Sequence, residues 1–261
     1  MSVDLTVVGS INLDLVARVR TLPRAGETLT ATEFDRFPGG KGANQAVAAA
    51  RLGARVTMIG AVGDDGLADE ALTGLREAGV ELQLERRAAT GIALIVVDAA
   101  GENQIVVVPG ANAEVTPTSP EGAVLCQLEV PDDVVLAAAR NADFFALNAA
   151  PARAIDVEPD LLIVNRLEHE MNSRGRLVAV TYGAEGAALF EDGVEIARAT
   201  PPTIDAVDGT AAGDAFAACL VVSLLEERPR EDALARACKA GALAASRLGA
   251  QPSLRTAAEL V

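Results

Sequence analysis

Two acidic residues and two glycines directly precede a long apolar run in DGTAAGDAF, residues 208–216. The run, residues 215–225, ends ahead of Pro229 and predicts a buried helix. Its first backbone amides, at residues 211–214, would point out of the helix N-terminus, where they and the helix dipole favour an anion. Asp214 either caps this helix or accepts the proton of a hydroxyl group that attacks a phosphoryl group held by those amides. The stretch therefore favours a phosphoryl-transfer site with Asp214 as the base.

A second polar segment is PGGKGAN, residues 38–44, at the start of another predicted helix. Its adjacent glycines let a ligand approach the backbone, while Lys41 supplies a cation and Asn44 supplies both a donor and an acceptor. The Walker A pattern GxxxxGK[ST] is absent, so these groups suit a hydroxyl-rich ligand. Asn12 and Asp14 follow the first predicted strand, at the edge where open α/β sheets bind ligands. The alternative for this pair is a turn that merely favours Asn and Asp.

Composition excludes several classes of function. The chain of 261 residues carries 22 basic and 37 acidic residues, a net charge of −15, which argues against nucleic-acid and membrane-surface binding. No basic leader region begins the sequence and no apolar run reaches the ~18 residues of a membrane span, so we expect a cytoplasmic protein. A single histidine, His169, excludes an HExxH zinc site and is expected to be solvated. The three cysteines are widely spaced and are expected in the core: Cys126, Cys219 and Cys238.

The elements that must position these residues alternate along the chain. Near-continuous apolar strands separated by helical patterns predict an α/β fold with three layers, α/β/α, around a mostly parallel central sheet. The predicted strands lie at residues 3–9, 55–63, 123–129, 143–148, 161–165 and 177–183, and the predicted helices at 41–53, 66–79 and 131–142.

Two segments interrupt the alternation. Residues 14–37 and 91–108 read as strand-turn-strand without a helix, and the second turns at residues 100–103. They predict a small antiparallel β lid that closes over the site and excludes water; the alternative is a pair of edge hairpins without such a role. No repeat or linker divides the sequence, so residues 1–261 are expected to form a single domain.

Taken together, these residues resemble the ribokinase-like (PfkB) family of sugar and nucleoside kinases. The resemblance implies an ATP-dependent kinase with a β lid over the sugar, which transfers a phosphoryl group to a primary hydroxyl. It runs in order along nearly the whole chain, through GSINLDLV (9–16), PGGKGANQAVAAARLGA (38–54), GDDGLA (63–68), TGIALIVVDAAGEN (90–103), LEVP (128–131), LNAAPAR (147–153), NRLE (165–168), TYGAEG (181–186), DGTAAGDAF (208–216) and GAQPS (249–253).

Within the family, the details are most similar to the kinases that act on ribose. The resemblance thus implies an ATP:D-ribose 5-phosphotransferase with Asp214 as the base. One alternative is a sibling kinase that acts on a nucleoside, on deoxyribose or on a ketose, and another is a non-catalytic sugar or nucleotide sensor. Aromatic residues make up 3% of the chain, with no Trp and one Tyr, so few rings are available to stack a nucleoside base.

The resemblance also assigns roles to individual residues. It implies that the sugar is bound by Asn12, Asp14, Gly40, Lys41, Asn44, Glu129 and Asp214. Beside Asp214, the anion hole for the transferred phosphoryl group would be Ala211, Ala212 and Gly213. The nucleotide would be lined by Asn165, Thr181, Gly183 and Gly186.

Two cofactor ions and a homodimer follow from the same resemblance. Mg²⁺, which must offset the phosphate charge, would be organised through water by Glu168 of an NxxE pattern. A monovalent cation, K⁺, would be held by Asp208, Thr210, Ala244, Arg247, Gly249 and Ser253, mostly through backbone carbonyls. The open edges of the lid favour a homodimer that pairs two lids.

The chain departs from the family pattern in two residues and two segments. Gly209 stands where relatives carry Thr, and Ala149 where they carry Pro. Residues 112–123 and 166–176 are each too short for a full crossover helix. Either the protein is compact at these places, or residues are absent from the sequence. We favour the second alternative, because losing sheet-covering helices would expose apolar surface, and it predicts breaks in the Cα trace near residues 116–120 and 170–175.

Overall fold

The apolar segments form one central sheet in the computed structural model, which describes residues 2–260. Its nine strands run in the order β13-β12-β11-β10-β9-β8-β1-β4-β5. All pairs from β5 to β11 are parallel, and only β12 and β13 at one edge are antiparallel. The strands are β1 (Asp4–Val8), β4 (Arg55–Gly63), β5 (Glu81–Arg87), β8 (Gly122–Gln127), β9 (Ala142–Asn148), β10 (Leu161–Asn165), β11 (Leu177–Thr181), β12 (Ala187–Glu191) and β13 (Val194–Ala199).

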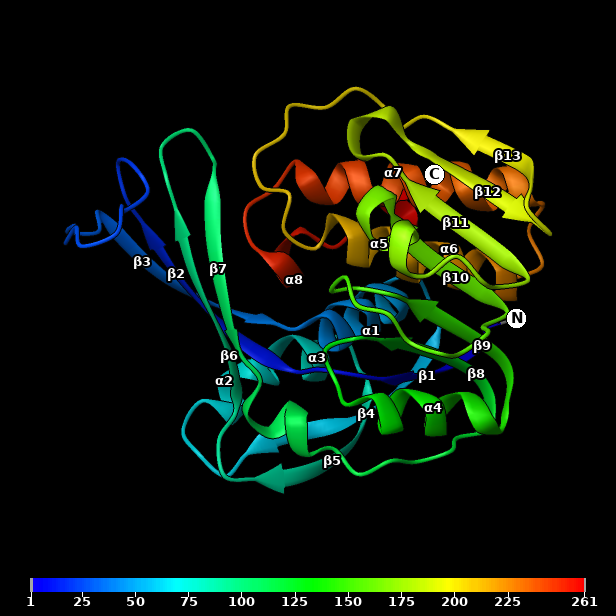
Figure 1. Ribbon diagram of the computed structural model, residues 1–261, viewed down its shortest axis with the longest axis horizontal. Coiled ribbons are helices and arrows are strands. Elements are labelled where there is room, and N and C mark those ends of the chain that lie inside the picture. The colour runs from blue at the N-terminus through cyan, green and yellow to red at the C-terminus, as the bar shows by residue number, and fades with distance from the viewer. Residues whose placement is uncertain (1, 261) are drawn as a thin grey trace.

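Helices cover both faces of this sheet (Figure 1). One face carries the larger hydrophobic cluster, which includes the buried helix α6 (Ala212–Leu225) between α1 (Lys41–Arg51) and α7 (Arg230–Ala245). The other face packs on α4 (Asp132–Arg140) and the short helix α5 (Arg166–Met171). These layers confirm the predicted α/β/α architecture. The remaining helices are short: α2 (Ala68–Ala71), α3 (Thr73–Glu77), α8 (Ala250–Ser253), η1 (Gly110–Glu114), η2 (Gly183–Glu185) and η3 (Ala257–Leu260).

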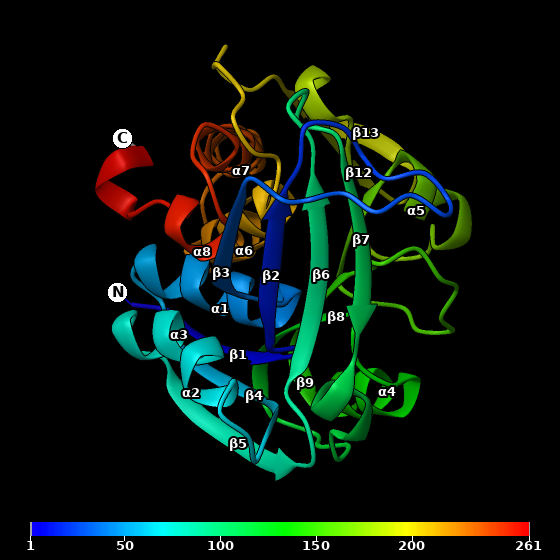
Figure 2. The same cartoon turned by 90° about the vertical axis from the view of Figure 1, so that its left-hand side faces the viewer.

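The two predicted hairpins form a second, four-stranded sheet, which we call the lid sheet. It contains β2 (Asn12–Arg18), β3 (Glu33–Gly39), β6 (Gly91–Val97) and β7 (Asn103–Val108), in the order β3-β2-β6-β7. Each hairpin is antiparallel, and the two join through the parallel pair of β2 and β6. Figure 2 shows these four strands side by side, projecting from the central sheet. The small second sheet predicted from these two segments is therefore confirmed, and its role as a lid stays a prediction.

The expected breaks in the Cα trace were wrong. Residues 2–260 form a continuous chain, and both crossovers are short. The first crossover has no helix over residues 115–121, and the second has only α5, a helix of 6 residues. The sheet is still covered, because Val115 is buried and Ile155 and Val157 of the connection between β9 and β10 pack against the core on that face. The assumption that only helices can cover apolar strands caused the error.

The cysteines and the long apolar helix lie where the sequence indicates. Cys126, Cys219 and Cys238 are free and buried, and their burial raises the pKa of each thiol. Helix α6 is buried from residue 214 to residue 223 because helices and strands surround it on all sides. Within residues 2–260, no helix is both long enough and apolar enough to cross a bilayer.

Candidate active site

Six of the seven residues predicted to bind sugar line a single cavity of about 370 Å³, which we call the polar cavity. It lies between the lid sheet, the carboxyl ends of the central strands and the first turn of α6. Two strands of the lid sheet contribute Ile95 and Asn103, so the lid forms one wall. The predicted residues in the lining are Asn12, Asp14, Lys41, Asn44, Glu129 and Asp214.

The seventh residue, Gly40, does not line the polar cavity, and its role is in the backbone conformation. It is the N-cap of α1 and has a φ of 87°, a left-handed conformation that favours glycine. A Cβ atom at this position would come within 2.7 Å of the Asn12 backbone nitrogen. The neighbouring Gly39 leaves the space that the Asp14 carboxylate occupies. The glycine pair therefore lets α1 begin directly against β2.

Asp214 is buried at the start of α6 and accepts two hydrogen bonds from consecutive residues of α1. Asn44 Nδ2 lies 2.9 Å from Oδ2, and Gln45 Nε2 lies 2.9 Å from Oδ1. Ahead of it, Ala211 takes the left-handed conformation (φ 60°) as the helix N-cap. A Cβ atom on Gly213 would meet no atom within 4 Å, so this backbone faces open space. The carboxylate and the amide end of α6 thus face one cavity.

Charged groups crowd the polar cavity. Burial raises the pKa of Asp14 to about 7, and the negative charges of Glu129 and Asp214 add to this effect. Burial opposes the charge of Lys41, but Asp214, Glu129, Glu168 and Asp14 outweigh it and raise the pKa of the ammonium group. Lys41 is therefore a permanent cation in a cavity lined by carboxyl groups.

Glu129 is held by one side chain and one backbone amide. Its Oε2 accepts a hydrogen bond from Ser10 Oγ (2.5 Å) and another from the Lys41 backbone nitrogen (3.0 Å). Asn12 is held in turn by Asn112, whose Nδ2 donates to Asn12 Oδ1 at 2.7 Å. These contacts fix two residues of the cavity wall.

A second cavity of about 510 Å³ adjoins the polar cavity across the first turn of α6. Thr181, Gly213 and Phe216 line both cavities. Three of the four predicted nucleotide residues, Thr181, Gly183 and Gly186, line the second cavity, whereas Asn165 lines the polar cavity near their junction. Ala212 also faces the second cavity, and Ala211 faces the polar one. The three residues of the predicted anion hole therefore lie at the boundary.

Glu168 and Asn165 form a reciprocal capping box at the start of α5. Glu168 Oε2 accepts a hydrogen bond from the Asn165 backbone nitrogen (2.8 Å), and its side chain lines the polar cavity. Burial raises its pKa. No group of three or more His, Cys, Asp or Glu side chains in residues 2–260 is arranged to hold a metal ion. The site fits Mg²⁺ only if the metal arrives with phosphate oxygens and water, with Glu168 as an outer ligand.

The residues predicted to hold a monovalent cation divide into two groups. Asp208, Thr210 and Gly249 are in direct contact, because the Asp208 carboxylate accepts from Thr210 N (2.9 Å), Thr210 Oγ1 (2.6 Å) and Gly249 N (2.8 Å). The other members make their contacts elsewhere: Ala244 O accepts from Arg247 N, Arg247 pairs with Glu259, and Ser253 Oγ donates to Ala250 O. The structure thus brings three of the six predicted residues into contact, and a K⁺ site at this loop stays a prediction.

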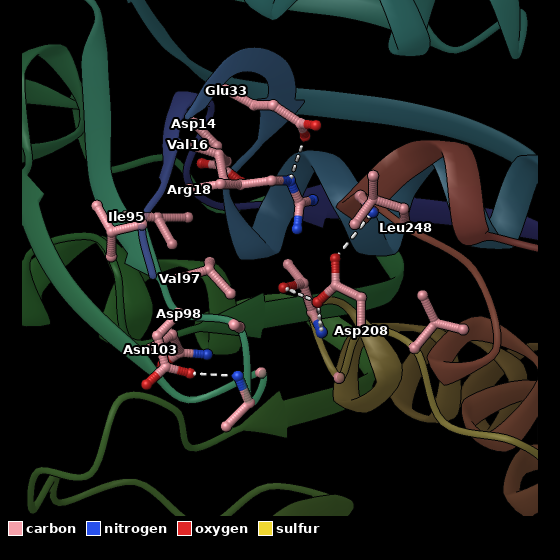
Figure 3. Close-up of a pocket in the computed structure, with 18 of the residues that line it drawn as sticks. Asp14, Val16, Arg18, Glu33, Ile95, Val97, Asp98, Asn103, Asp208 and Leu248 are labelled. Carbon is pink, nitrogen blue, oxygen red and sulfur yellow. Dashed lines mark hydrogen bonds and ion pairs between the residues drawn. The ribbon is translucent and has the colours of Figure 1, made fainter. Parts of the chain in front are cut away.

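An open cleft of about 820 Å³ separates the lid sheet from this loop (Figure 3). Asp14, Arg18 and Ile95 lie on one side, and Asp208 and Leu248 on the other. The cleft shares Asp14, Ile95 and Asn103 with the polar cavity, so it is the outer part of the same opening.

Several residues of the site were missed by sequence reasoning. Gln45 and Gln127 are fully buried and contact the site from behind, while Asn148 lines the polar cavity. Asn112 holds Asn12. Gln45 lies in the motif PGGKGANQAVAAARLGA and Asn148 in LNAAPAR, so the sequence contained a signal for both residues. Gln127 and Asn112 lie outside the matched motifs, so the sequence contained no signal for them.

Comparison with known proteins agrees with this geometry. The model of the pfkB family carbohydrate kinases matches residues 3–148 and 124–257. The ribokinase of Bacillus subtilis is 36% identical over 288 residues, covering 98% of each chain. The ribokinase structure from Thermotoga maritima superposes with a TM-score of 0.87 at 30% identity over 100% of this chain and 98% of that one. The structure of the Arabidopsis thaliana ribokinase complexed with ribose and ATP superposes with a TM-score of 0.84 at 27% identity. This match covers 100% of the present chain and 98% of the Arabidopsis chain.

The family match spans both sheets and every part of the site described above. The chain belongs to the pfkB family of carbohydrate kinases.

Proposed function

We propose that this protein is an ATP-dependent ribokinase, which transfers the γ-phosphoryl group of ATP to the 5-hydroxyl of D-ribose. Similarity to ribokinases along 98% of the chain supports the sugar class. The observation that carries the reaction is the place of Asp214, which lies in the polar cavity directly after Gly213, where the second cavity begins. A base between a sugar cavity and a nucleotide cavity is what in-line phosphoryl transfer requires.

The polar cavity supplies the groups that a sugar needs. Asn44 Oδ1 is buried and has no hydrogen-bond partner among the described residues, so a sugar hydroxyl can satisfy it. Asp14 and Glu129 add carboxylate acceptors, and Asn12 adds an amide. In the proposed roles these residues, with Lys41 and the backbone at Gly40, orient ribose so that its 5-hydroxyl faces Asp214.

In the proposed mechanism, the hydroxyl proton passes to a carboxylate oxygen of Asp214 as the sugar oxygen bonds to the γ-phosphorus. The bond between the γ-phosphorus and its bridging oxygen breaks, and ADP leaves. Backbone amides of Ala211, Ala212 and Gly213 at the positive end of α6 stabilise the transferred group, and the Ala212 amide exchanges its contact with Gly209 O (3.2 Å) for a phosphoryl oxygen. Lys41 offsets phosphate charge, and bound Mg²⁺, with Glu168 as an outer ligand, would offset more of it.

Three further parts belong to this proposal. Asn165, Thr181, Gly183 and Gly186 hold the nucleotide, and K⁺ binds the loop around Asp208. The free cysteines suit the reducing cytoplasm. Residues 1–261 act as one unit, and two copies form a homodimer through the lid sheet.

The test is ADP release from MgATP with K⁺ present, over a panel of ribose, deoxyribose, fructose, adenosine and inosine. We expect turnover with ribose that falls at least about a thousandfold in Asp214→Asn while ribose binding persists. Turnover with another substrate alone would move the assignment to a sibling kinase. Binding of ribose and ATP without ADP release would show a sensor instead.

A further inference from the structure

We infer that Gln45 is a positioning residue that sets the orientation of the general base Asp214; the inference rests on the proposed function. Gln45 is fully buried in α1 and lines neither cavity, so it acts on the substrate only through another residue. Its Nε2 donates to Asp214 Oδ1 at 2.9 Å. Asn44, one residue earlier, reaches the other carboxylate oxygen and also lines the polar cavity.

The orientation of the Gln45 amide is fixed by its neighbours. Its Oε1 accepts from Gln127 Nε2 at 2.7 Å, and its Nε2 donates to Asn148 Oδ1 at 2.9 Å as well as to Asp214. The reverse orientation would place two amide nitrogens together and turn an oxygen toward a carboxylate. Asn148 on β9, whose own Nδ2 is bound to Ile163 O, therefore turns the donor of Gln45 toward Asp214, and the hydrogen bond from Gln127 on β8 matches this orientation.

This arrangement connects the central sheet to the base through three buried amides. Asn148 is itself anchored, because its Nδ2 donates to Ile163 O of β10 at 3.2 Å. Asp214 thus stays in place when no sugar is bound, whereas Asn44 can exchange its contacts with the ligand. These different roles of Gln45 and Asn44 predict that loss of Gln45 impairs the chemical step, because a base misplaced by about 1 Å costs on the order of a hundredfold in rate.

The test uses Gln45→Met in the full chain, since Met fills a similar unbranched volume without donors. We expect kcat with ribose to fall between about tenfold and a hundredfold while the KM for ribose stays within about twofold. Asn172→Leu is the control, because Asn172 is a buried amide whose side chain, among the described residues, forms hydrogen bonds only with Arg153 O and Ile155 N. The control should lower the melting temperature and leave kcat unchanged.

Gln127→Met is a milder second variant, because it releases the Gln45 amide without removing it. We expect a smaller fall in kcat, and the double variant Gln45→Met/Gln127→Met should be no slower than Gln45→Met alone. Additive losses, an unchanged kcat in Gln45→Met, or a loss confined to KM would each overturn the inference.

A crystal structure of Gln45→Met provides a readout that does not depend on activity. We expect the Asp214 carboxylate to leave its position against Asn44, and an unmoved carboxylate would overturn the inference. The proposed function fails separately, if the wild-type protein does not phosphorylate ribose.

Discussion

Asp14 holds a buried carboxyl group whose pKa is raised from 3.8 to about 7 by burial and by the charges of Glu129 and Asp214. The unfolded chain releases this proton near pH 4, whereas the folded protein keeps it until about pH 7. Above pH 7 the folded state must therefore carry a buried charge that the unfolded state carries at no cost. The contribution of Asp14 to the free energy of unfolding falls as pH rises from about 4 through 7.

Asp14→Asn should remove this penalty. We expect the variant to exceed the wild type in free energy of unfolding by on the order of 2 kcal/mol at pH 8, with the difference vanishing near pH 4. Urea unfolding at the two pH values measures it. Asp205→Asn, at an exposed loop position, is the control and should show no such pH-dependent difference. An equal effect of Asp14→Asn at both pH values would contradict the assignment.

At the scale of elements, the lid sheet joins the core through Asn112 of η1. This buried side chain accepts from Ile11 N (2.9 Å) and donates to Ile11 O (3.1 Å), Asn12 Oδ1 (2.7 Å) and Pro109 O (3.0 Å). It therefore ties the end of β7 to the start of β2. Gly91 makes room for the contact, since a Cβ atom there would collide with both Asn112 and Asn12.

Asn112→Ala should loosen this junction. We expect the free energy of unfolding to drop by on the order of 2 kcal/mol, because Ile11 N and Asn12 lose buried partners. The KM for ribose should rise more than kcat falls, since Asn12 loses its orientation. Steady-state kinetics and urea unfolding measure both effects. Asn172→Ala should reproduce the stability loss alone; a matching rise in KM in that control would refute the explanation.

The strands and helices with a regular hydrophobic pattern could be predicted from the sequence. Strands such as β4, in which seven of the nine residues are apolar or glycine, and the hairpins of the lid sheet were predictable from local pattern. The two short crossovers were not, because their cover comes from single residues such as Ile155 in extended backbone, which has no period. The carboxylate and lysine of the site belong to recognisable motifs. Gln127 belongs to no such motif, because its contact with Gln45 forms only when the fold brings β8 beside α1.

At the scale of the whole molecule, the net charge of −15 repels the anionic substrate that the proposed reaction needs. Attraction for ATP must therefore be local. Lys41 and the amide end of α6 are the positive groups that face the two cavities, and Mg²⁺ carried by the nucleotide adds to them. The acidic surface keeps separate molecules apart, so association of two copies requires an apolar patch.

Such a patch covers the outer face of the lid sheet, opposite the face that lines the cavities. Leu94 pairs with Val106 across β6 and β7, and their exposed fractions are 43% and 61%. Val108, opposite Ile92, and Phe34, opposite Ala17, extend the same face. The inner face instead presents Asp14, Ile95 and Asn103 to the cavities. A homodimer would bury the outer patch and leave the site open.

Leu94→Lys/Val106→Lys should therefore convert the protein from a dimer to a monomer of 26.8 kDa, because each interface would have to bury four ammonium groups. Sedimentation equilibrium gives the mass, and wild type should sediment at twice that value. Val194→Lys changes a residue of similar exposure, 64%, on β13 and should leave the dimer intact. A monomeric wild type, or a double variant that remains dimeric, would place the contact between copies elsewhere or remove it. If the dimer also stabilises the lid sheet, the monomeric variant should bind ribose more weakly. Its kcat should stay near the wild-type value, because Asp214 is held by α1.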